Sequence, residues 1–209
     1  MMLRQPITAR ESVNSLLFEA EPMVHPHVLA AFRKASRALE SRGIVFRSIG
    51  GIALNLRGAG RPTRDIDLVV SRADWLEAID VLRHSIGTDL QGIRFGLPDE
   101  PACGLAVIGP HGVPIEVWPA GTTHATIARL RGAHRPHPAG DLVLTLAGDD
   151  DVNLINSKLA SYLSATDRLR DAADVEALIK RQRLPLDYAQ RLAPPVRGAY
   201  RRLWKRLHP

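Results

Sequence analysis

One stretch decides the fold, residues 44–70, which read IVFRSIGGIALNLRGAGRPTRDIDLVV. Its first part, Ile44–Ile49, is short, apolar and partly β-branched, which predicts a strand. The Gly50-Gly51 pair breaks that strand, and Ile52–Arg57 is long enough for one or two helical turns. A loop with two glycines and a proline then leads into Asp65–Val70, whose Ile, Leu and Val residues predict a second strand.

The flanking sequence alternates between helical and strand patterns. Hydrophobic spacing predicts helices at residues 28–41, 73–86, 149–163 and 166–180, and strands at 104–108, 113–118 and 141–146. Residues 1–24 lack clear periodicity and are expected to form a loosely packed arm. The fold class is therefore α/β (α+β), with a small mixed sheet followed by a C-terminal helical region. We expect a core at 1–148 and a helical region with a basic tail at 149–209.

Composition excludes several classes of protein. The chain has 209 residues, of which 45% are hydrophobic and 24% charged, as is typical of a globular protein. No run approaches the roughly 18 apolar residues of a membrane helix, so we expect a cytoplasmic protein without a membrane partner. Cys103 is the only cysteine, which excludes an internal disulfide and a cysteine-based zinc site.

The net charge of +6 is concentrated near the C-terminus. Residues 181–209 carry eight basic side chains and one acidic side chain, so the other 180 residues sum to −1. Such a segment suits a polyanion such as RNA. A solvated arginine-rich helix face explains it equally well.

Asp65 and Asp67 are the first candidate metal ligands. Residues two apart on a strand point to the same face, so the two carboxylates lie close together while Ile66 and Leu68 point into the core. Paired carboxylates repel each other and call for a cation. Mg²⁺ prefers oxygen ligands and completes its shell with water and substrate phosphates, so this pair and a triphosphate form a complete site.

The glycine pair makes this interpretation more specific. Gly50 and Gly51 stand between the first strand and the short helix, and a glycine turn at the start of a helix lets phosphate approach the backbone closely. An isolated Gly-Gly pair is usually only a turn. The combination of strand, glycine pair, short helix, glycine loop and Asp-x-Asp strand is far more informative.

This arrangement resembles the signature of the nucleotidyltransferase superfamily that includes DNA polymerase β. The resemblance rests on Ile49-Gly-Gly-Ile-Ala-Leu54 and on Arg61-Pro-Thr-Arg-Asp-Ile-Asp-Leu-Val-Val70. In particular, the chain is similar to the toxin half of type IV abortive-infection toxin–antitoxin pairs. Those proteins combine a Gly-Gly or Gly-Ser turn, an Arg-x-Thr/Ser lead-in and an Asp-x-Asp pair with a later lysine-bearing helix and an Arg-Asp-x-x-Asp element.

The later elements of that pattern are also present. Lys158 lies in a predicted helix and is one of only four lysines among 28 basic residues. Arg170-Asp171-Ala-Ala-Asp174 follows, and Arg170 is expected to pair with Asp174 at the i,i+4 spacing. The resemblance implies that Lys158 places a positive charge on the triphosphate, and that Asp171 and Asp174 anchor Lys158 or position the acceptor. Otherwise Asp171 and Asp174, with Asp167, form a solvated acidic stripe.

A third carboxylate is expected on a neighbouring strand. Glu116 is the best placed, since Ile115 and Val117 would face the core while Glu116 faces the site. It is also the candidate base for the acceptor hydroxyl. Asp89 and Asp141 are the alternatives.

The resemblance implies a polymerase-β-like fold, two Mg²⁺ ions and a nucleoside triphosphate donor. The remaining substrate contacts that it implies come from Gly50, Gly51, Thr63 and Arg64. The expected activity is transfer of a nucleotide to a hydroxyl of RNA, at the 3′ end of tRNA, by a toxin that a cognate antitoxin restrains. The alternatives are transfer to a small molecule, as in aminoglycoside nucleotidyltransferases, and a binding module that has lost catalysis.

Overall fold

A computed structural model describes residues 24–86, 93–95, 104–108, 110–130, 138–165 and 168–209. The strands are β1 (Phe46–Ile49), β2 (Ile66–Val70), β3 (Ile93–Phe95), β4 (Gly104–Ile108) and β5 (Pro114–Pro119). The α-helices are α2 (Pro26–Ser41), α3 (Gly50–Asn55), α4 (Trp75–Ile86), α5 (His124–Leu130), α6 (Asp150–Ser164), α7 (Leu169–Gln182) and α8 (Pro194–Leu207). Short 3₁₀ turns, η1 (Pro110–Gly112) and η2 (Leu186–Arg191), complete the described elements.

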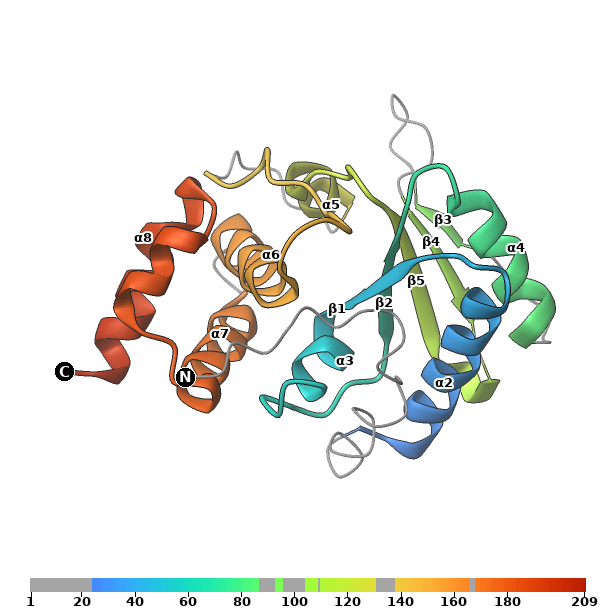
Figure 1. The fold of residues 1–209 in the computed structure, drawn as a ribbon, viewed down its shortest axis with the longest axis horizontal. Coiled ribbons are helices and arrows are strands. Elements are labelled where there is room, and N and C mark those ends of the chain that lie inside the picture. Colours follow the sequence, from blue (N-terminus) through green and yellow to red (C-terminus); the bar gives the residue numbers. More distant parts are fainter. Residues whose placement is uncertain (1–23, 87–92, 96–103, 109, 131–137, 166–167) are drawn as a thin grey trace.

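The five strands form one mixed sheet in the order β1-β2-β5-β4-β3. Only β2 and β5 run parallel; the other neighbouring pairs are antiparallel. Figure 1 shows the sheet between α2 and α4 on one side and the later helices on the other. The predicted α+β class, with a small mixed sheet followed by helices, is confirmed.

Alternation along β2 and β5 gives the sheet two different faces. Leu68 and Val117, and apolar residues two positions away from them on the same strands, belong to the core beneath α2 and α4. Val69 and Trp118 belong to a separate apolar cluster, which includes Ile127 of α5. Since side chains alternate along a strand, Asp67 and Glu116 lie on the same face as Val69 and Trp118, toward the C-terminal helices.

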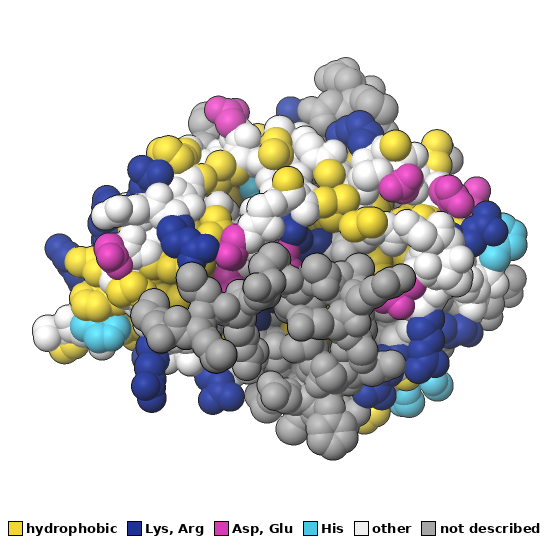
Figure 2. Space-filling model, in the orientation of Figure 1, with side chains coloured by type: hydrophobic (Ala, Val, Ile, Leu, Met, Phe, Trp, Pro, Cys, Tyr) yellow, Lys and Arg dark blue, Asp and Glu magenta, His cyan; other side chains and the backbone are white. Residues whose placement is uncertain are grey.

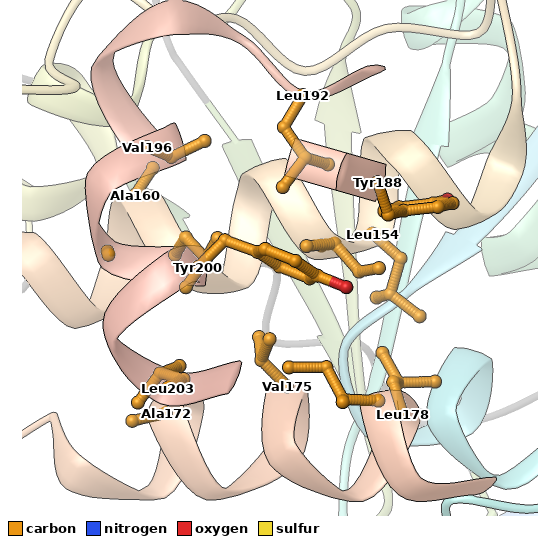
Figure 3. Packing of buried hydrophobic residues seen from close by; sticks show 14 of the residues in the cluster. Leu154, Ala160, Ala172, Val175, Leu178, Tyr188, Leu192, Val196, Tyr200 and Leu203 are labelled. Carbon is orange, nitrogen blue, oxygen red and sulfur yellow. The ribbon is translucent and has the colours of Figure 1, made fainter. Parts of the chain in front are cut away.

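The C-terminal helices pack around Tyr200, which is fully buried (Figure 3). Its hydroxyl donates to the carbonyl of Pro185 at 3.0 Å, which satisfies the polar end of the ring. Burial raises the pKa of Tyr200 above its usual range. Leu54 of α3 belongs to the same apolar cluster, so the short helix of the decisive stretch packs on the C-terminal helices.

Two arginines connect the N-terminal elements to the start of α6. Arg47 of β1 pairs with Asp150 at 2.6 Å and donates to the carbonyls of the preceding loop, including that of Leu146 at 2.8 Å. Arg57, just after α3, pairs with Asp151. Burial lowers the pKa of Arg47, while Asp150 opposes this by favouring the charged form.

The predicted elements are largely confirmed, with shifts of a few residues at their ends. The strand predicted at 141–146 is wrong. That segment makes only an isolated bridge, between Thr123 and Val143, because its backbone groups bond to the turn before α5. The helix α5 and the strand β3 were not predicted, and of the expected arm at 1–24 only Val24 lies within the described residues.

The aspartates at the start of α6 have different roles. Asp149 is the N-cap, accepting hydrogen bonds from the N–H groups of Asp151 and Val152 at 2.9 and 3.0 Å. Asp150 and Asp151 instead form the ion pairs with arginines. No helix in the described part of the chain is long and apolar enough to span a membrane.

Replacing Asp149 with alanine is expected to lower the free energy of unfolding by about 1 kcal/mol, because two N–H groups lose their acceptor. Asp141→Ala, at an exposed position, serves as the control. Although burial opposes ionisation, hydrogen bonds and the nearby Arg191 lower the pKa of Asp149. Its charge therefore stabilises the fold above the unfolded-state pKa of about 3.9, and this contribution is lost as the pH falls through the folded-state pKa.

Urea denaturation at about pH 7 and about pH 3 checks both expectations. The difference in stability between wild type and Asp149→Ala should narrow at the lower pH. An equal difference at both pH values would show that the carboxylate charge contributes nothing.

Candidate active site

Two carboxylates lie side by side on the sheet face that looks toward the C-terminal helices. Asp67 of β2 and Glu116 of β5 are direct partners in the parallel register, and both are half-buried. Neighbouring strands lie about 4.8 Å apart, so the two side chains leave the sheet next to each other. The register therefore brings Glu116 to the position expected of the third carboxylate.

The two glycines make room for neighbouring side chains. Both belong to α3, of which Gly50 is the first residue, with a φ of 68°. A Cβ on Gly50 would collide with Oδ2 of Asp67, and one on Gly51 would collide with Oγ1 of Thr63. The glycines thus admit the Asp67 and Thr63 side chains. Their expected approach to phosphate stays a prediction.

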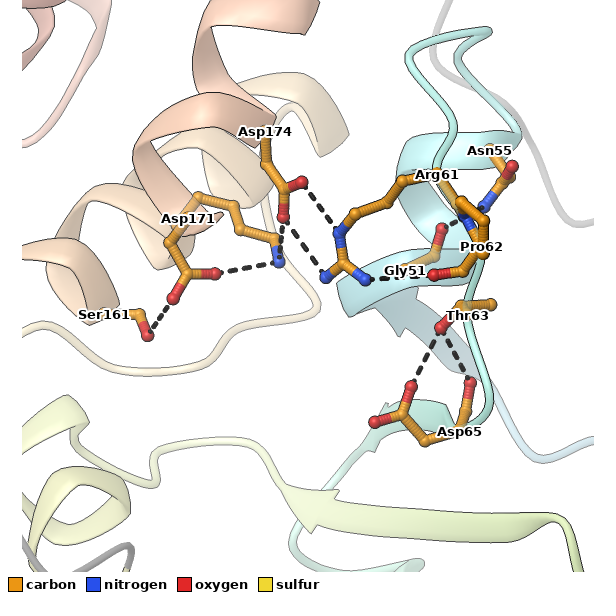
Figure 4. Close-up of polar contacts among 10 residues, drawn as sticks. Gly51, Asn55, Arg61, Pro62, Thr63, Asp65, Ser161, Asp171 and Asp174 are labelled. Atoms are coloured by element: carbon orange, nitrogen blue, oxygen red, sulfur yellow. Dashed lines mark hydrogen bonds and ion pairs between the residues drawn. The ribbon is translucent and has the colours of Figure 1, made fainter. Parts of the chain in front are cut away.

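Asp65 lies one residue before β2 and is exposed. The buried hydroxyl of Thr63 donates to its Oδ1 at 2.9 Å, which fixes the carboxylate (Figure 4). Arg64 is exposed and forms no ion pair with another residue in the described ranges. Thr63 therefore positions a carboxylate, while Arg64 projects into solvent.

Lys158 is held in a buried charge network between α6 and α7. Its ammonium lies 3.1 Å from Oδ1 of Asp171 and 2.8 Å from Oδ2 of Asp174. All three residues are less than 9% exposed, which excludes the solvated acidic stripe. Ser161 donates to the other oxygen of Asp171 at 2.7 Å, so that carboxylate has a partner on each side.

Asp174 also binds Arg61, which the sequence did not single out as a site residue. The Nε of Arg61 donates to Oδ1 of Asp174 at 2.8 Å, as Figure 4 shows, while Oδ2 of Asp174 faces the ammonium of Lys158. The expected pair of Asp174 with Arg170 is therefore wrong; Arg170 is exposed. The buried Asn55 amide donates to the carbonyl of Arg61 at 3.0 Å and fixes the loop that delivers it.

A pocket lies between the sheet face and α6, with Asp67 and Gly50 at its edge. Its two walls differ in chemistry. Mainly apolar side chains form one wall, those of Ile49, Trp118, Ile127, Ala128 and Leu144, together with the polar His124 of α5. Polar and charged side chains form the other, those of Ser157, Lys158, Ser161, Ser164, Arg168 and Asp171.

The donor set around Asp67 suits a hard divalent cation in part. Asp67 and Glu116 offer carboxylate oxygens from adjacent strands, as Mg²⁺ prefers, and water or phosphate oxygens ordinarily complete its shell. Across the described ranges, no three Asp, Glu, His or Cys side chains are gathered closely enough to hold a metal by themselves. Asp65 is thus not brought together with Asp67 and Glu116 as a closed three-ligand site.

The remaining expectations for the site have mixed outcomes. Asp141 is exposed, does not lie on the sheet and does not line the pocket. Asp89 lies outside the described residues. Arg61 and Arg168 were missed as parts of the site: Arg61 stands at the start of the motif that was recognised, whereas Arg168 carries no pattern beyond its closeness to Asp171.

No family model matches the sequence, and no curated protein matches it. Solved structures that are similar include the antibiotic-resistance factor ANT(2″)-Ia, with 12% identity, a TM-score of 0.48, and coverage of 86% of this chain and 91% of that chain. A CCA-adding enzyme from Thermotoga maritima, complexed with tRNA, has 18% identity, a TM-score of 0.44, and coverage of 90% and 49%.

A CCA-adding enzyme in complex with CTP is also similar, with 17% identity, a TM-score of 0.43, and coverage of 91% of this chain and 46% of that chain. The chain therefore spans about half the length of these two CCA-adding enzymes.

Proposed function

We propose that this chain is a polymerase-β-like, metal-dependent nucleotidyltransferase that transfers a nucleotide from a nucleoside triphosphate to an acceptor hydroxyl. One observation carries the proposal: Asp67 and Glu116 leave adjacent parallel strands side by side, and Asp67 shares a pocket with the buried Lys158. A carboxylate pair opposite a fixed cation suits a metal-bound polyphosphate. The sequence motif that contains Asp67 supports the same reaction.

Asp67 and Glu116 would hold Mg²⁺, with Asp65 as the third proposed ligand once a substrate is bound. Two bound ions would stabilise charge on the attacking and leaving oxygens and orient them. In the reaction, the acceptor oxygen bonds to the α-phosphorus, the bond from that phosphorus to pyrophosphate breaks, and Glu116 takes the hydroxyl proton.

The other proposed residues position these groups. Asp171 and Asp174 fix the ammonium of Lys158, which faces the donor phosphates as a point charge. Thr63 orients Asp65, and the absence of side chains at Gly50 and Gly51 lets Asp67 and Thr63 lie against α3. Arg64, which is exposed, contacts substrate beyond the pocket.

We propose RNA, at the 3′ end of tRNA, as the acceptor. The exposed side of α8 carries Arg201, Arg202 and Lys205, none of which forms an ion pair with a residue of the described ranges. Figure 2 shows Lys and Arg side chains projecting from the end of the molecule that α8 forms in Figure 1. In the cell the enzyme would act in the cytoplasm as a toxin restrained by a cognate antitoxin.

The reaction is tested with each radiolabelled nucleoside triphosphate, total RNA and Mg²⁺. Label is expected to enter RNA with the wild type and to fall to background with Asp65→Ala/Asp67→Ala, because the metal ligands are removed. Asp80→Ala, on α4 beneath the opposite face of the sheet, is the matched control and should label RNA normally.

Two other results would redirect the proposal. If no RNA is labelled but the wild type transfers label to an aminoglycoside, the chemistry stands and the acceptor is a small molecule. If the wild type neither transfers label nor binds a triphosphate with Mg²⁺, the chain is a non-catalytic binding module.

A second experiment separates the structural and catalytic roles of Lys158. Lys158→Met leaves two buried carboxylates short of a cation and is expected to lower the free energy of unfolding by about 3 kcal/mol. Adding Asp171→Asn removes one uncompensated charge and should restore much of that stability without restoring transfer. Recovery of transfer in the double variant, measured beside its urea denaturation, would show that Lys158 serves only the fold.

A third experiment tests the acceptor. Replacing Arg201, Arg202 and Lys205 with glutamine should weaken RNA binding and reduce the slope of log K against log salt by about 0.7 for each phosphate that is no longer neutralised. A control with Arg37, Arg42 and Arg83 replaced by glutamine removes equal charge from α2, its C-cap and α4. Equal effects of the two triple variants would mean that net charge, rather than the α8 surface, governs binding.

A further inference from the structure

The polar wall of the pocket contains three serine hydroxyls, and two of them donate to other residues that the structure describes. Ser161 donates to Asp171 and Ser164 donates to the carbonyl of Ser161, each at 2.7 Å. Ser157 also lines the wall, yet its hydroxyl has no hydrogen-bond partner among the residues that the structure describes. One serine of the wall therefore remains available to a ligand.

Lys158 and Arg168, which line the pocket, differ in whether they form ion pairs. Lys158 pairs with Asp171 and Asp174, and Arg61, which does not line the pocket, pairs with Asp174, so this network of two cations and two anions is neutral. Arg168 lines the same wall but forms no ion pair with any residue in the described ranges. Within the described ranges, the charge of Arg168 is therefore not balanced by an acidic partner.

The main chain holds Arg168 at this position. Its N–H donates to the carbonyl of Ala165 at 3.3 Å, and its own carbonyl accepts from the N–H of Asp171 at 3.1 Å. The side chain is half-buried rather than extended into solvent. Because Asp171 also binds Lys158, the backbone of Arg168 is tied directly to the charge network.

We propose that Arg168 and Ser157 form a phosphate subsite for the terminal phosphates of the triphosphate, in the pocket that Asp67 also lines. This inference rests on the proposed function and names two of its binding residues. A polyphosphate carries several negative charges, which the neutralised Lys158 cannot balance alone. A guanidinium binds phosphate oxygens through two parallel N–H groups, and a serine hydroxyl adds a donor beside it.

The test uses inorganic tripolyphosphate, titrated calorimetrically into the full chain in EDTA so that neither a nucleobase nor a metal contributes. Arg168→Gln is expected to weaken binding about tenfold, because a charged pair of hydrogen bonds is removed, and Ser157→Ala about threefold. Arg168→Lys should recover part of the affinity. Arg170→Gln, two residues along and exposed, removes the same charge outside the pocket and should leave the affinity unchanged.

Thermal unfolding of each variant confirms that the fold is retained. Equal losses of affinity in Arg168→Gln and Arg170→Gln, or no binding of tripolyphosphate by the wild type, would overturn the subsite. If the wild type transfers nucleotide while Arg168→Gln binds tripolyphosphate normally, the subsite is wrong and the proposed function stands. If Arg168 is needed for binding but the wild type transfers nothing, the subsite stands and the proposed function fails.

Discussion

The ion pairs of Asp174 with Lys158 and Arg61 are the constraint on which the rest of the structure depends. One carboxylate, only 4% exposed, joins α7 to α6 and also to the loop between α3 and β2. A buried charge is costly unless its partners are well placed, so the three segments must meet in one arrangement. The pocket lies at this junction, and the position of its polar wall relative to Asp67 follows from the same contacts.

The sheet side of the pocket is explained by the alternation of side chains along a strand. Leu68 and Val117 fill the core beneath α2 and α4, which leaves Asp67 and Glu116 on the face toward the helices. Gly50 then allows α3 to lie against the Asp67 carboxylate. The sheet thus supplies Asp67 and Glu116 on one side, and α6 and α7 supply the buried network of Lys158, Asp171 and Asp174 on the other.

Much of this could be predicted from local patterns, and the misses share a cause. Periodicity identified β2, β5, α6 and α7, and strand alternation predicted that Glu116 would accompany Asp67. The partner of Asp174 was missed because Arg61 is 113 positions away, whereas Arg170 stands at the helical spacing. The division at residues 148 and 149 stays a prediction; Leu54 of α3 packs in the cluster of the C-terminal helices.

Arg61 and Asp174 are 113 positions apart in the sequence, so the ribosome makes them at different times. A ribosome releases the sheet carboxylates first, and α6 and α7 only after most of the intervening chain. During synthesis the sheet carboxylates therefore exist before Lys158 and its partners, and Arg61 lacks Asp174. A nascent chain would therefore lack the helical wall of the pocket until α6 and α7 pack against the sheet.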